Sequence, residues 1–278
     1  MLLTGNDKMP DVCVLLIEGT NCEKETQEAF SGVGLDAELV HLKQLLGDCE
    51  RQRKRRLSDY GMLMLPGGWS AGDYIRAGAI FAARMKSKLG DELKDFVESG
   101  NLVLGVCNGF QILTEMGLLP AFKGISDVPT ASLTNNLSSC FQCRPTYIKH
   151  VNKTPLTGKL DLGDVIQVPV AHAEGRFTFG EKQDMMLKQL IENNQIVFRY
   201  CRVDGSEAQE IYPWNPNGSI YDIAGICNPE RNVLGLMPHP ERVINRLQMT
   251  DWTRKDNGDA GDGRVVFESI AGYLKAIV

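Results

Sequence analysis

Three short apolar runs constrain the fold of this 278-residue chain more than any other feature of its sequence. They are Val12–Ile17, Met62–Leu65 and Leu102–Val106, and in none of them do polar residues alternate with apolar ones. Runs of this kind are typical of strands buried on both faces, which occur in parallel sheets that helices cover. The runs therefore predict the central strands of a parallel sheet.

Helical segments separate these runs. Thr20 or Asn21 is placed to cap the first of them, and Gly32 is placed to end it. Strand and helix in alternation favour a mostly parallel sheet flanked by helices, an α/β fold with right-handed crossovers. The expected helices are Glu23–Phe30, Tyr74–Ser99 with a break near Gly90, and Phe110–Met116, and a further strand is expected at Ala37–Leu42.

The second half of the chain is richer in turns, such as Asp204-Gly205. Its strand-like pieces are interpreted as further strands, some of them antiparallel, that extend the same sheet. The chain contains no low-complexity linker and no internal repeat, so we expect a single domain over residues 1–278. The pieces in question are Val165–Val170, Ile196–Tyr200 and Val233–Met237.

The charge balance argues against two classes of partner. The chain has 35 acidic and 30 basic residues, a net charge of −5, so we expect no general affinity for nucleic acid or for anionic membranes. The basic run Arg51–Arg56 is interpreted as a solvated loop or helix end. No window approaches the ~18 consecutive apolar residues of a membrane span, and Met1–Pro10 lacks the pattern of a signal peptide. We therefore expect a cytoplasmic protein.

The eight cysteines are scattered along the chain, unlike those of a small disulfide-rich scaffold. Cys140 and Cys143 form a C-x-x-C pair, but neither a second pair nor a histidine pair follows to complete a zinc site. We therefore expect no metal on this chain.

One of the cysteines occupies a position with catalytic meaning. The strand Leu102–Val106 runs into Gly105-Val106-Cys107-Asn108-Gly109 and then into a helix, which is the nucleophile-elbow pattern with cysteine in place of serine. Gly105 and Gly109 remove side chains that would collide where strand and helix cross. The helix also points its N-terminus at the sulfur, which favours the thiolate. Cys107 is therefore the candidate nucleophile, although buried structural cysteines are common in such turns.

A second glycine turn lies in a matching position. The strand Met62–Leu65 ends in Pro66-Gly67-Gly68. If the two strands are neighbours, the N–H of Gly68 can lie opposite the N–H of Asn108, and two backbone donors beside a nucleophile form an oxyanion hole. The alternative is an ordinary turn, because Pro-Gly-Gly is common at turns.

The chain offers four histidines as a general base for the thiol: His41, His150, His172 and His239. His239 directly follows the apolar piece Val233–Met237, which places it at a strand end. Glu241 follows two residues later, across a proline, and can orient the imidazole through its second nitrogen. Cys107, His239 and Glu241 are therefore the predicted catalytic triad.

These residues carry a family resemblance. Pro66-Gly67-Gly68, the segment Gly105–Gln111 and Pro238-His239-Pro240-Glu241 resemble the class I glutamine amidotransferases, which have a flavodoxin-like fold and a Cys-His-Glu triad. The resemblance implies that Cys107 attacks the side-chain amide of glutamine and that His239 and Glu241 assist it. It also implies tentative glutamine-binding roles for Gln111, Asn136 and Phe141.

Further segments narrow the resemblance to the glutaminase subunits of phosphoribosylformylglycinamidine synthases, which act in purine biosynthesis. By this resemblance the ammonia passes to an ATP-dependent synthetase subunit that amidates formylglycinamide ribonucleotide, and a small accessory subunit belongs to the complex. We expect no cofactor on this chain, which has no phosphate-binding glycine motif, and we expect ATP and magnesium on the partner. The segments are Gly19–Cys22, Ala171–Phe177, Asn215–Ser219 and Met237–Arg242.

Several alternatives and roles remain open at this point. The chain fits a class I amidotransferase that serves another ammonia acceptor, a non-catalytic interaction subunit of the same fold, or a cysteine peptidase of a related fold. His172 and Glu174 resemble a second acid–base pair that lines the site or an interface. We expect the loop Pro213–Ser219 to be a movable element and the chain to be poorly active without its partner.

Overall fold

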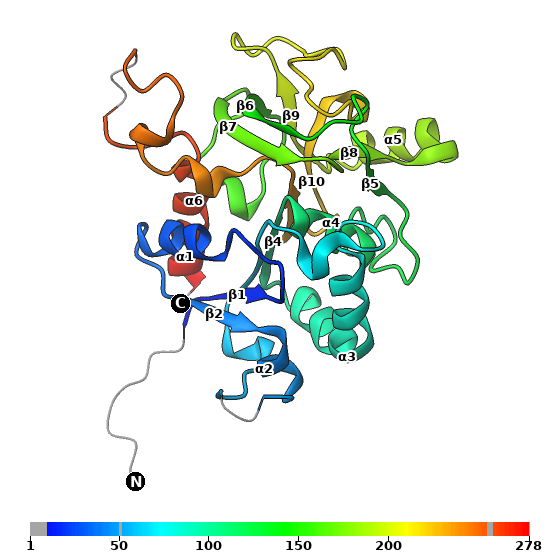
Figure 1. Cartoon of the computed structure of the whole chain (residues 1–278), viewed down its shortest axis with the longest axis vertical. Coiled ribbons are helices and arrows are strands. Elements are labelled where there is room, and N and C mark those ends of the chain that lie inside the picture. Colours follow the sequence, from blue (N-terminus) through cyan, green and yellow to red (C-terminus); the bar gives the residue numbers. More distant parts are fainter. Residues whose placement is uncertain (1–9, 50–51, 255–257, 278) are drawn as a thin grey trace.

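The computed structural model describes residues 10–49, 52–254 and 258–277. Its main feature is a nine-stranded sheet with the strand order β2-β1-β3-β4-β11-β10-β9-β6-β7 (Figure 1). The strands β2, β1, β3, β4 and β11 are mutually parallel, and each remaining strand runs antiparallel to its neighbours. The predicted fold class, a mostly parallel sheet flanked by helices with additional antiparallel strands, is confirmed.

The parallel strands form where the sequence has its apolar runs. Val12–Leu16, Met62–Leu65 and Leu102–Val106 are β1, β3 and β4, and nearly all of their residues are fully buried. Ala37–His41 is β2 at the edge, and Val233–Leu236 is β11 beside β4. Because parallel strands end at the same edge of a sheet, β3, β4 and β11 deliver their following residues to one place.

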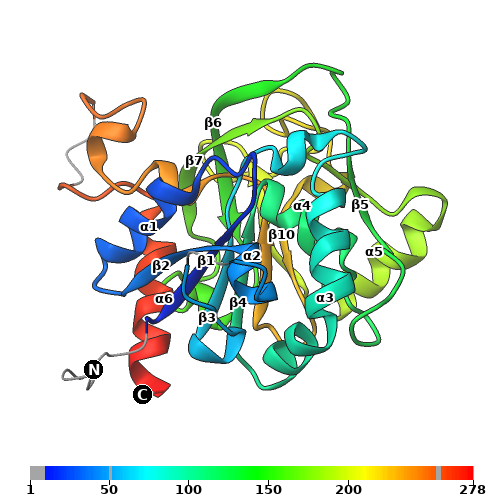
Figure 2. The same ribbon diagram turned by 60° about the horizontal axis from the view of Figure 1, so that its bottom comes forward.

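Helices cover both faces of the parallel half (Figure 2). On one face α1, Glu23–Ser31, packs against α6, Arg264–Ile277, through an edge-to-face contact of Phe30 with Phe267 at 4.9 Å between ring centroids. On the other face α3, Ala79–Glu98, packs against α4, Asn108–Glu115. The short helix α2, Leu42–Leu46, lies beside β2.

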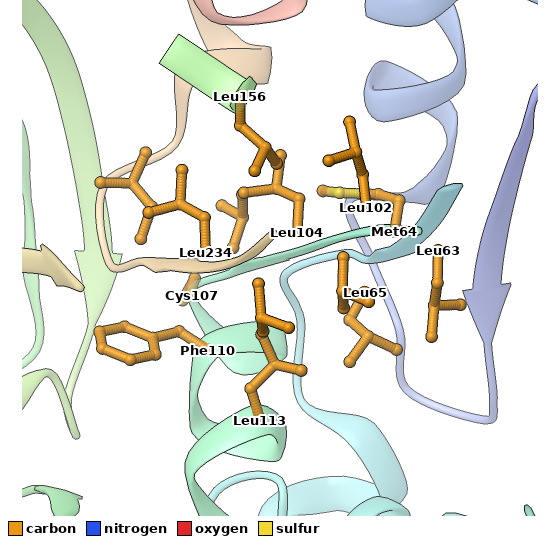
Figure 3. Packing of buried hydrophobic residues seen from close by; sticks show 14 of the residues in the cluster. Leu63, Met64, Leu65, Leu102, Leu104, Cys107, Phe110, Leu113, Leu156 and Leu234 are labelled. Atoms are coloured by element: carbon orange, nitrogen blue, oxygen red, sulfur yellow. The ribbon is translucent and has the colours of Figure 1, made fainter. Parts of the chain in front are cut away.

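The core continues across both faces of the central strands. Figure 3 shows Phe110 and Leu113 of α4 on one side of β4 and Leu156 on the other side. All three side chains are almost completely buried. Burial of one such side chain contributes roughly 1.5–3 kcal/mol to folding, so the strand that precedes Cys107 is held firmly from both sides.

The antiparallel half completes the sheet and adds a separate ribbon. β6 pairs with both β7 and β9, and β10 joins this group to β11. A two-stranded ribbon of β5 and β8 lies apart from the main sheet. The bounds are Ser132–Thr134 for β5, Gln142–His150 for β6, Val165–His172 for β7, Arg176–Thr178 for β8, Gln183–Glu192 for α5, Ile196–Cys201 for β9 and Ile223–Cys227 for β10.

Three local predictions were wrong. Cys22, rather than Thr20 or Asn21, precedes α1 and gives no side-chain cap. The expected break near Gly90 does not occur, because α3 runs through this position and a Cβ there would touch nothing within 4 Å. α3 also begins at Ala79 instead of Tyr74, because Ala71, Gly72 and Asp73 adopt positive φ in the turn before it.

The segment Pro213–Ser219 was expected to be movable, and this was also wrong. Asn215, Asn217 and Ser219 are almost completely buried and bond to one another and to the backbone of Gly175. Asn215 further binds Asp222 at 2.9 Å. Buried polar groups paired in this way make a rigid core element.

Two further observations concern the surface. Of the basic run 51–56, Arg55 forms an ion pair with Glu38 at 2.7 Å, whereas Arg51 lies outside the described residues, as does most of Met1–Pro10. None of the helices in the described ranges is both long and apolar enough to cross a membrane.

Candidate active site

The turn from β4 into α4 has the strained geometry expected of a nucleophile elbow. Cys107 has φ 52° and ψ −106°, a conformation that side chains rarely adopt. A Cβ on Gly109 would lie 1.9 Å from the carbonyl oxygen of Leu65, and one on Gly105 would lie 2.6 Å from the backbone of Gly109. The prediction that both glycines permit a close crossing of strand and helix is confirmed.

The glycine turn after β3 lies beside this elbow. β3 and β4 are parallel neighbours, as the oxyanion hypothesis required. A Cβ on Gly67 would lie 3.4 Å from the Cβ of Cys107 and 2.7 Å from Cε1 of His239, so only glycine leaves room for both side chains. No hydrogen bond found among the described residues uses the N–H of Gly68 or that of Asn108. Both donors are therefore without an acceptor in this part of the chain.

His239 and Glu241 meet in the arrangement that the sequence predicted. The Nδ1–H of His239 donates to Oε1 of Glu241 at 2.6 Å. This bond fixes the tautomer and leaves Nε2 without a hydrogen-bond partner in the part of the chain that the structure describes. The backbone N–H of His239 donates to the carbonyl oxygen of Pro169 at 2.8 Å, which anchors the residue to β7.

The electrostatics of the imidazole favour its protonated form. Burial lowers the pKa of His239, but the Glu241 carboxylate and the negative charge of a Cys107 thiolate outweigh burial and hold the pKa well above its ordinary value. A proton taken from the thiol of Cys107 is thus well accommodated on His239. The three residues form a group that can activate a sulfur nucleophile.

Cys22 lies near the same nitrogen of His239 that faces Glu241. Its Sγ is 3.9 Å from Nδ1 of His239 and accepts a hydrogen bond from Nη2 of Arg242 at 3.1 Å. Its Sγ, Nδ1 of His239 and a carboxylate oxygen of Glu241 lie within 4.8 Å of one another, a spacing that suits a thiophilic metal ion. Such an ion would compete with the bond between His239 and Glu241. The sequence motif contained Cys22 but gave no sign of this contact.

Gln111 and Asn108 connect the elbow helix to its surroundings. Nδ2 of Asn108 donates to Oε1 of Gln111 at 3.0 Å, and Nε2 of Gln111 donates to the carbonyl oxygen of Glu174 at 2.6 Å. The side-chain oxygen of Asn108 accepts from the N–H of Ser70 at 3.3 Å. These bonds tie α4 to the turn after β3 and to the segment after β7. A direct contact of Gln111 with glutamine stays a prediction.

Asn136 organises the segment that contains His172. Its Nδ2 donates to the carbonyl oxygens of Cys140 and His172, both at 2.9 Å, and its Oδ1 accepts from the N–H of Gly175 and from Nδ1 of His172. These four bonds use the capacity of the amide, so its clear role here is structural. Its predicted contact with glutamine remains untested.

His172 and Glu174 are not an acid–base pair in this structure. Burial, together with the nearby His239, lowers the pKa of His172 to about 3, so the imidazole is neutral at physiological pH. The carboxylate of Glu174 instead accepts from the backbone N–H of Ala77 at 3.1 Å. The segment lies beside the candidate nucleophile, because the Cys107 thiol points to the carbonyl oxygen of Ala171 with an Sγ to O distance of 3.7 Å.

Phe141 differs from the other predicted residues because it is exposed. Its ring stacks on Trp69 with centroids 6.5 Å apart, and each side chain keeps about half of its surface accessible, 48% and 49%. By contrast, Cys107 is 5% exposed and His239 1%. The reactive groups are covered, whereas the aromatic pair beside the turn after β3 faces solvent.

Comparisons with known proteins agree with this geometry. Residues 9–274 match the family described as CobB/CobQ-like glutamine amidotransferase domain. The chain is 48% identical over 271 residues to the phosphoribosylformylglycinamidine synthase subunit PurQ of Archaeoglobus fulgidus, with 96% of this chain and 97% of the relative covered. It is also 48% identical over 256 residues to the subunit of that name from Picrophilus torridus, with 91% and 94% covered.

A solved structure shows the same likeness. A chain in the structure of PurLQS from Thermotoga maritima superposes with a TM-score of 0.71 at 32% identity, covering 96% of this chain and 99% of that one. The matched regions span nearly the whole sequence. The chain therefore belongs to the CobB/CobQ-like glutamine amidotransferase family and, within it, to the group of the phosphoribosylformylglycinamidine synthase subunits PurQ.

Proposed function

We propose that this chain is the glutaminase subunit of a phosphoribosylformylglycinamidine synthase in purine biosynthesis. The observation that carries the proposal is the covered group of Cys107, His239 and Glu241 at the ends of β4 and β11. The relatives that are 48% identical to this chain have the corresponding name, and the matched regions span more than nine-tenths of each protein.

The reaction begins at the thiol of Cys107. Nε2 of His239 takes the thiol proton, and the sulfur attacks the side-chain amide carbon of glutamine. The bond from Glu241 stabilises the imidazolium that forms. The imidazolium then returns the proton to the leaving nitrogen, so that ammonia departs and a glutamyl thioester remains.

Hydrolysis of the thioester completes the cycle. His239 deprotonates a water molecule, which attacks the thioester carbonyl and releases glutamate and the Cys107 thiol. In both halves of the reaction the negative charge on the carbonyl oxygen needs preorganised donors. We assign this role to the N–H groups of Gly68 and Asn108, which no group in the described part of the chain uses.

The ammonia passes to an ATP-dependent synthetase subunit that converts formylglycinamide ribonucleotide to formylglycinamidine ribonucleotide. ATP and magnesium belong to that partner, and a small accessory subunit completes the complex. The similar chain from Thermotoga maritima comes from a structure of PurLQS, a name that supports a multisubunit assembly. The exposed pair Trp69 and Phe141 beside the covered site is suited to contact such a partner, because exposed aromatic side chains are enriched at interfaces.

The cover over the site supports control by the partner. With Cys107 and His239 almost completely buried, glutamine needs a rearrangement to reach the sulfur. The rigid Asn215–Ser219 core is not the element that moves, since its side chains are buried and bonded. The turn of residues 70–73 is better suited, because three of its four residues adopt positive φ. Docking that favours an open form would raise glutaminase activity.

The test is an assay of the purified chain with and without the synthetase and accessory subunits. We expect glutamine-dependent amidation of formylglycinamide ribonucleotide only in the complete mixture with ATP, and glutamine hydrolysis that rises on assembly. A different acceptor used in preference to formylglycinamide ribonucleotide would contradict the proposed function. Equal hydrolysis in the presence and absence of the partner subunits would contradict the proposed coupling alone.

A further inference from the structure

Three buried side chains with metal-binding atoms converge around the imidazole of His239. Sγ of Cys22, a ring nitrogen of His239 and a carboxylate oxygen of Glu241 all lie within 4.8 Å of one another, and each of the three residues is 1% exposed. Thiolate, imidazole and carboxylate are the side-chain groups that bind Zn²⁺ in proteins. The proposed glutaminase mechanism uses the histidine and the carboxylate but gives the sulfur of Cys22 no role.

The separations between these atoms suit the bond lengths of a zinc ion. Sγ of Cys22 lies 3.9 Å from Nδ1 of His239, and Zn–S and Zn–N bonds of about 2.3 and 2.0–2.1 Å can span up to about 4.4 Å between two such atoms. Oε1 of Glu241 lies 2.6 Å from the same nitrogen, whereas two tetrahedral ligands of this kind lie about 3.3 Å apart. A movement of the carboxylate by less than about 1 Å therefore admits the ion.

The carboxylate of Glu241 has a second oxygen atom that favours a cation. This atom, Oε2, is buried and has no hydrogen-bond partner in the described part of the chain. A buried anionic oxygen without a partner is costly, and coordination to a metal ion removes this cost. The unpaired oxygen is an observation independent of the spacing, and it points to the same kind of ligand.

The sulfur of Cys22 is connected to the surface through Arg242. Nη2 of Arg242 donates to Sγ of Cys22 at 3.1 Å, and its Nε forms an ion pair with Glu25 at 3.4 Å. The side chains of Arg242 and Glu25 are 31% and 32% exposed. Because the guanidinium repels a cation, an arriving metal ion has to displace it from the sulfur, and this displacement opens a route from solvent.

We propose that Cys22, His239 and Glu241 bind Zn²⁺, with water as a fourth ligand, and that the bound ion inhibits the glutaminase reversibly. Binding releases the thiol proton of Cys22 to solvent and requires Nδ1 of His239 to be unprotonated. The neutral imidazole then holds its single proton on Nε2, the nitrogen that otherwise takes the proton of the Cys107 thiol. The inhibitory effect rests on the proposed function, whereas the metal site does not.

The first test is direct binding to the whole chain. Cys140→Ser/Cys143→Ser is the background for all measurements, because these two exposed thiols can bind metal by themselves. Isothermal titration with Zn²⁺ should give one site, and titration with Cd²⁺ should produce thiolate-to-metal absorption. Cys22→Ala should weaken Zn²⁺ binding by at least about 100-fold, since loss of a group behind a metal ligand already costs about 10- to 100-fold. Cys107→Ala is the matched control and should retain the site.

A second variant keeps the binding test decisive if Cys22→Ala does not fold. Glu241→Gln replaces the anionic ligand and should weaken Zn²⁺ binding by about tenfold or more. Melting temperatures within a few degrees of the parent show which variants fold. Unchanged binding in a folded Cys22→Ala or Glu241→Gln variant overturns the proposal, and so does the absence of thiolate absorption with Cd²⁺. Binding that is lost in Cys107→Ala also overturns it, because the ion would then lie on the nucleophile.

The second test measures inhibition of the assembled complex. Saturating Zn²⁺ should lower glutamine-dependent amidation by about 10²-fold or more, the contribution expected of a general base, and a chelator should restore it. Amidation with added ammonia should persist. Equal loss of both activities would place the inhibiting metal on the partner and overturn the inhibitory role. Zn²⁺ binding at Cys22 that leaves glutamine hydrolysis unchanged would contradict His239 as the base in the proposed function, while the metal site would stand.

Discussion

The parallel and antiparallel halves of the sheet contribute to the active site in different ways. β3, β4 and β11 end at one edge and deliver the glycine turn, the proposed nucleophile and the proposed base as short sequence motifs. β7 approaches from the antiparallel half and contributes mainly backbone, through the carbonyl oxygens of Pro169 and Ala171. The parallel half therefore places the chemical groups, and the antiparallel half holds them in position.

One buried polar network in each half shows a related difference. In the antiparallel half, Asn136, Asn217 and Ser219 are almost completely buried and bond mostly to backbone groups and to each other. In the parallel half, the buried polar pair His239 and Glu241 keeps one reactive nitrogen unpaired among the described residues. A saturated network stabilises the fold, whereas an unsaturated pair remains available for chemistry.

The largest effect is expected at the nucleophile. Cys107→Ala should lower glutamine-dependent amidation by the assembled complex by about 10⁴-fold or more, because no thioester can form. Amidation with added ammonia should persist, since the acceptor reaction does not use Cys107. Cys22→Ala is the matched control, because it removes a second buried thiol beside the same imidazole. If Cys107→Ala retains glutaminase activity and Cys22→Ala loses it, Cys22 rather than Cys107 is the nucleophile.

The next effect concerns the carboxylate that orients the base. Glu241→Gln should lower kcat/KM for glutamine by roughly 10²- to 10⁴-fold, as expected when a triad acid is neutralised. Because the Glu241 carboxylate raises the pKa of His239, its loss should lower that pKa. The alkaline limb of the pH–rate profile, where the imidazolium loses its proton, should therefore move to lower pH. A shift toward higher pH would contradict the assigned electrostatics.

For a substitution in the antiparallel half, we expect the protein to lose stability and to keep most of its catalytic activity. Asn217→Ala removes bonds to Gly175, Tyr200 and Ser219 and should reduce the free energy of unfolding by about 1–3 kcal/mol for each buried group left unpaired. Urea denaturation measures this change. At a temperature where the variant is folded, kcat/KM should fall far less than in Glu241→Gln. A large loss of kcat/KM without destabilisation would give the antiparallel half a direct chemical role.

The last prediction concerns thermal stability and places the same substitution at two glycines. Gly90→Ala should stabilise the protein by about 0.5–1 kcal/mol, because Gly90 lies within α3 and a Cβ there meets nothing within 4 Å. Gly109→Ala should destabilise it, because the added Cβ would overlap the carbonyl oxygen of Leu65. Thermal unfolding of both variants checks the signs. Equal melting temperatures would mean that the crossing of β4 and α4 is looser than this structure shows.

The parts of the fold that could be predicted from the sequence are those with local signals. β3 and β4 match their expected bounds because unbroken apolar runs end in glycine turns. β6 was missed because Gln142, Arg144 and Lys149 interrupt its apolar residues, and its pairing with β7 and β9 is set by long-range contacts. α6 was missed as well, because its run of Val265, Val266 and Phe267 reads equally well as a strand.

The candidate site divides in the same way. The sequence shows where the strands before Cys107 and His239 end. Because parallel strands end at one edge of the sheet, the proximity of Cys107, His239 and Glu241 could be predicted. The contact of Cys22 with His239 could not, because it depends on how the turn before α1 packs on residues more than 200 positions later. The burial of Asn215–Ser219 could not be predicted from the sequence either, because prolines, asparagines and glycine usually indicate an exposed loop.

The cover over Cys107 also has a chemical consequence for the lifetime of the protein. Thiols of this kind are oxidised to sulfenic acid and beyond, and accessibility controls how fast this happens. Cys140 and Cys143 are exposed, whereas Cys107 is 5% exposed. Oxidants and alkylating agents in solution therefore meet Cys140 and Cys143 before they meet Cys107. The burial that covers the proposed nucleophile therefore also protects its sulfur from oxidation.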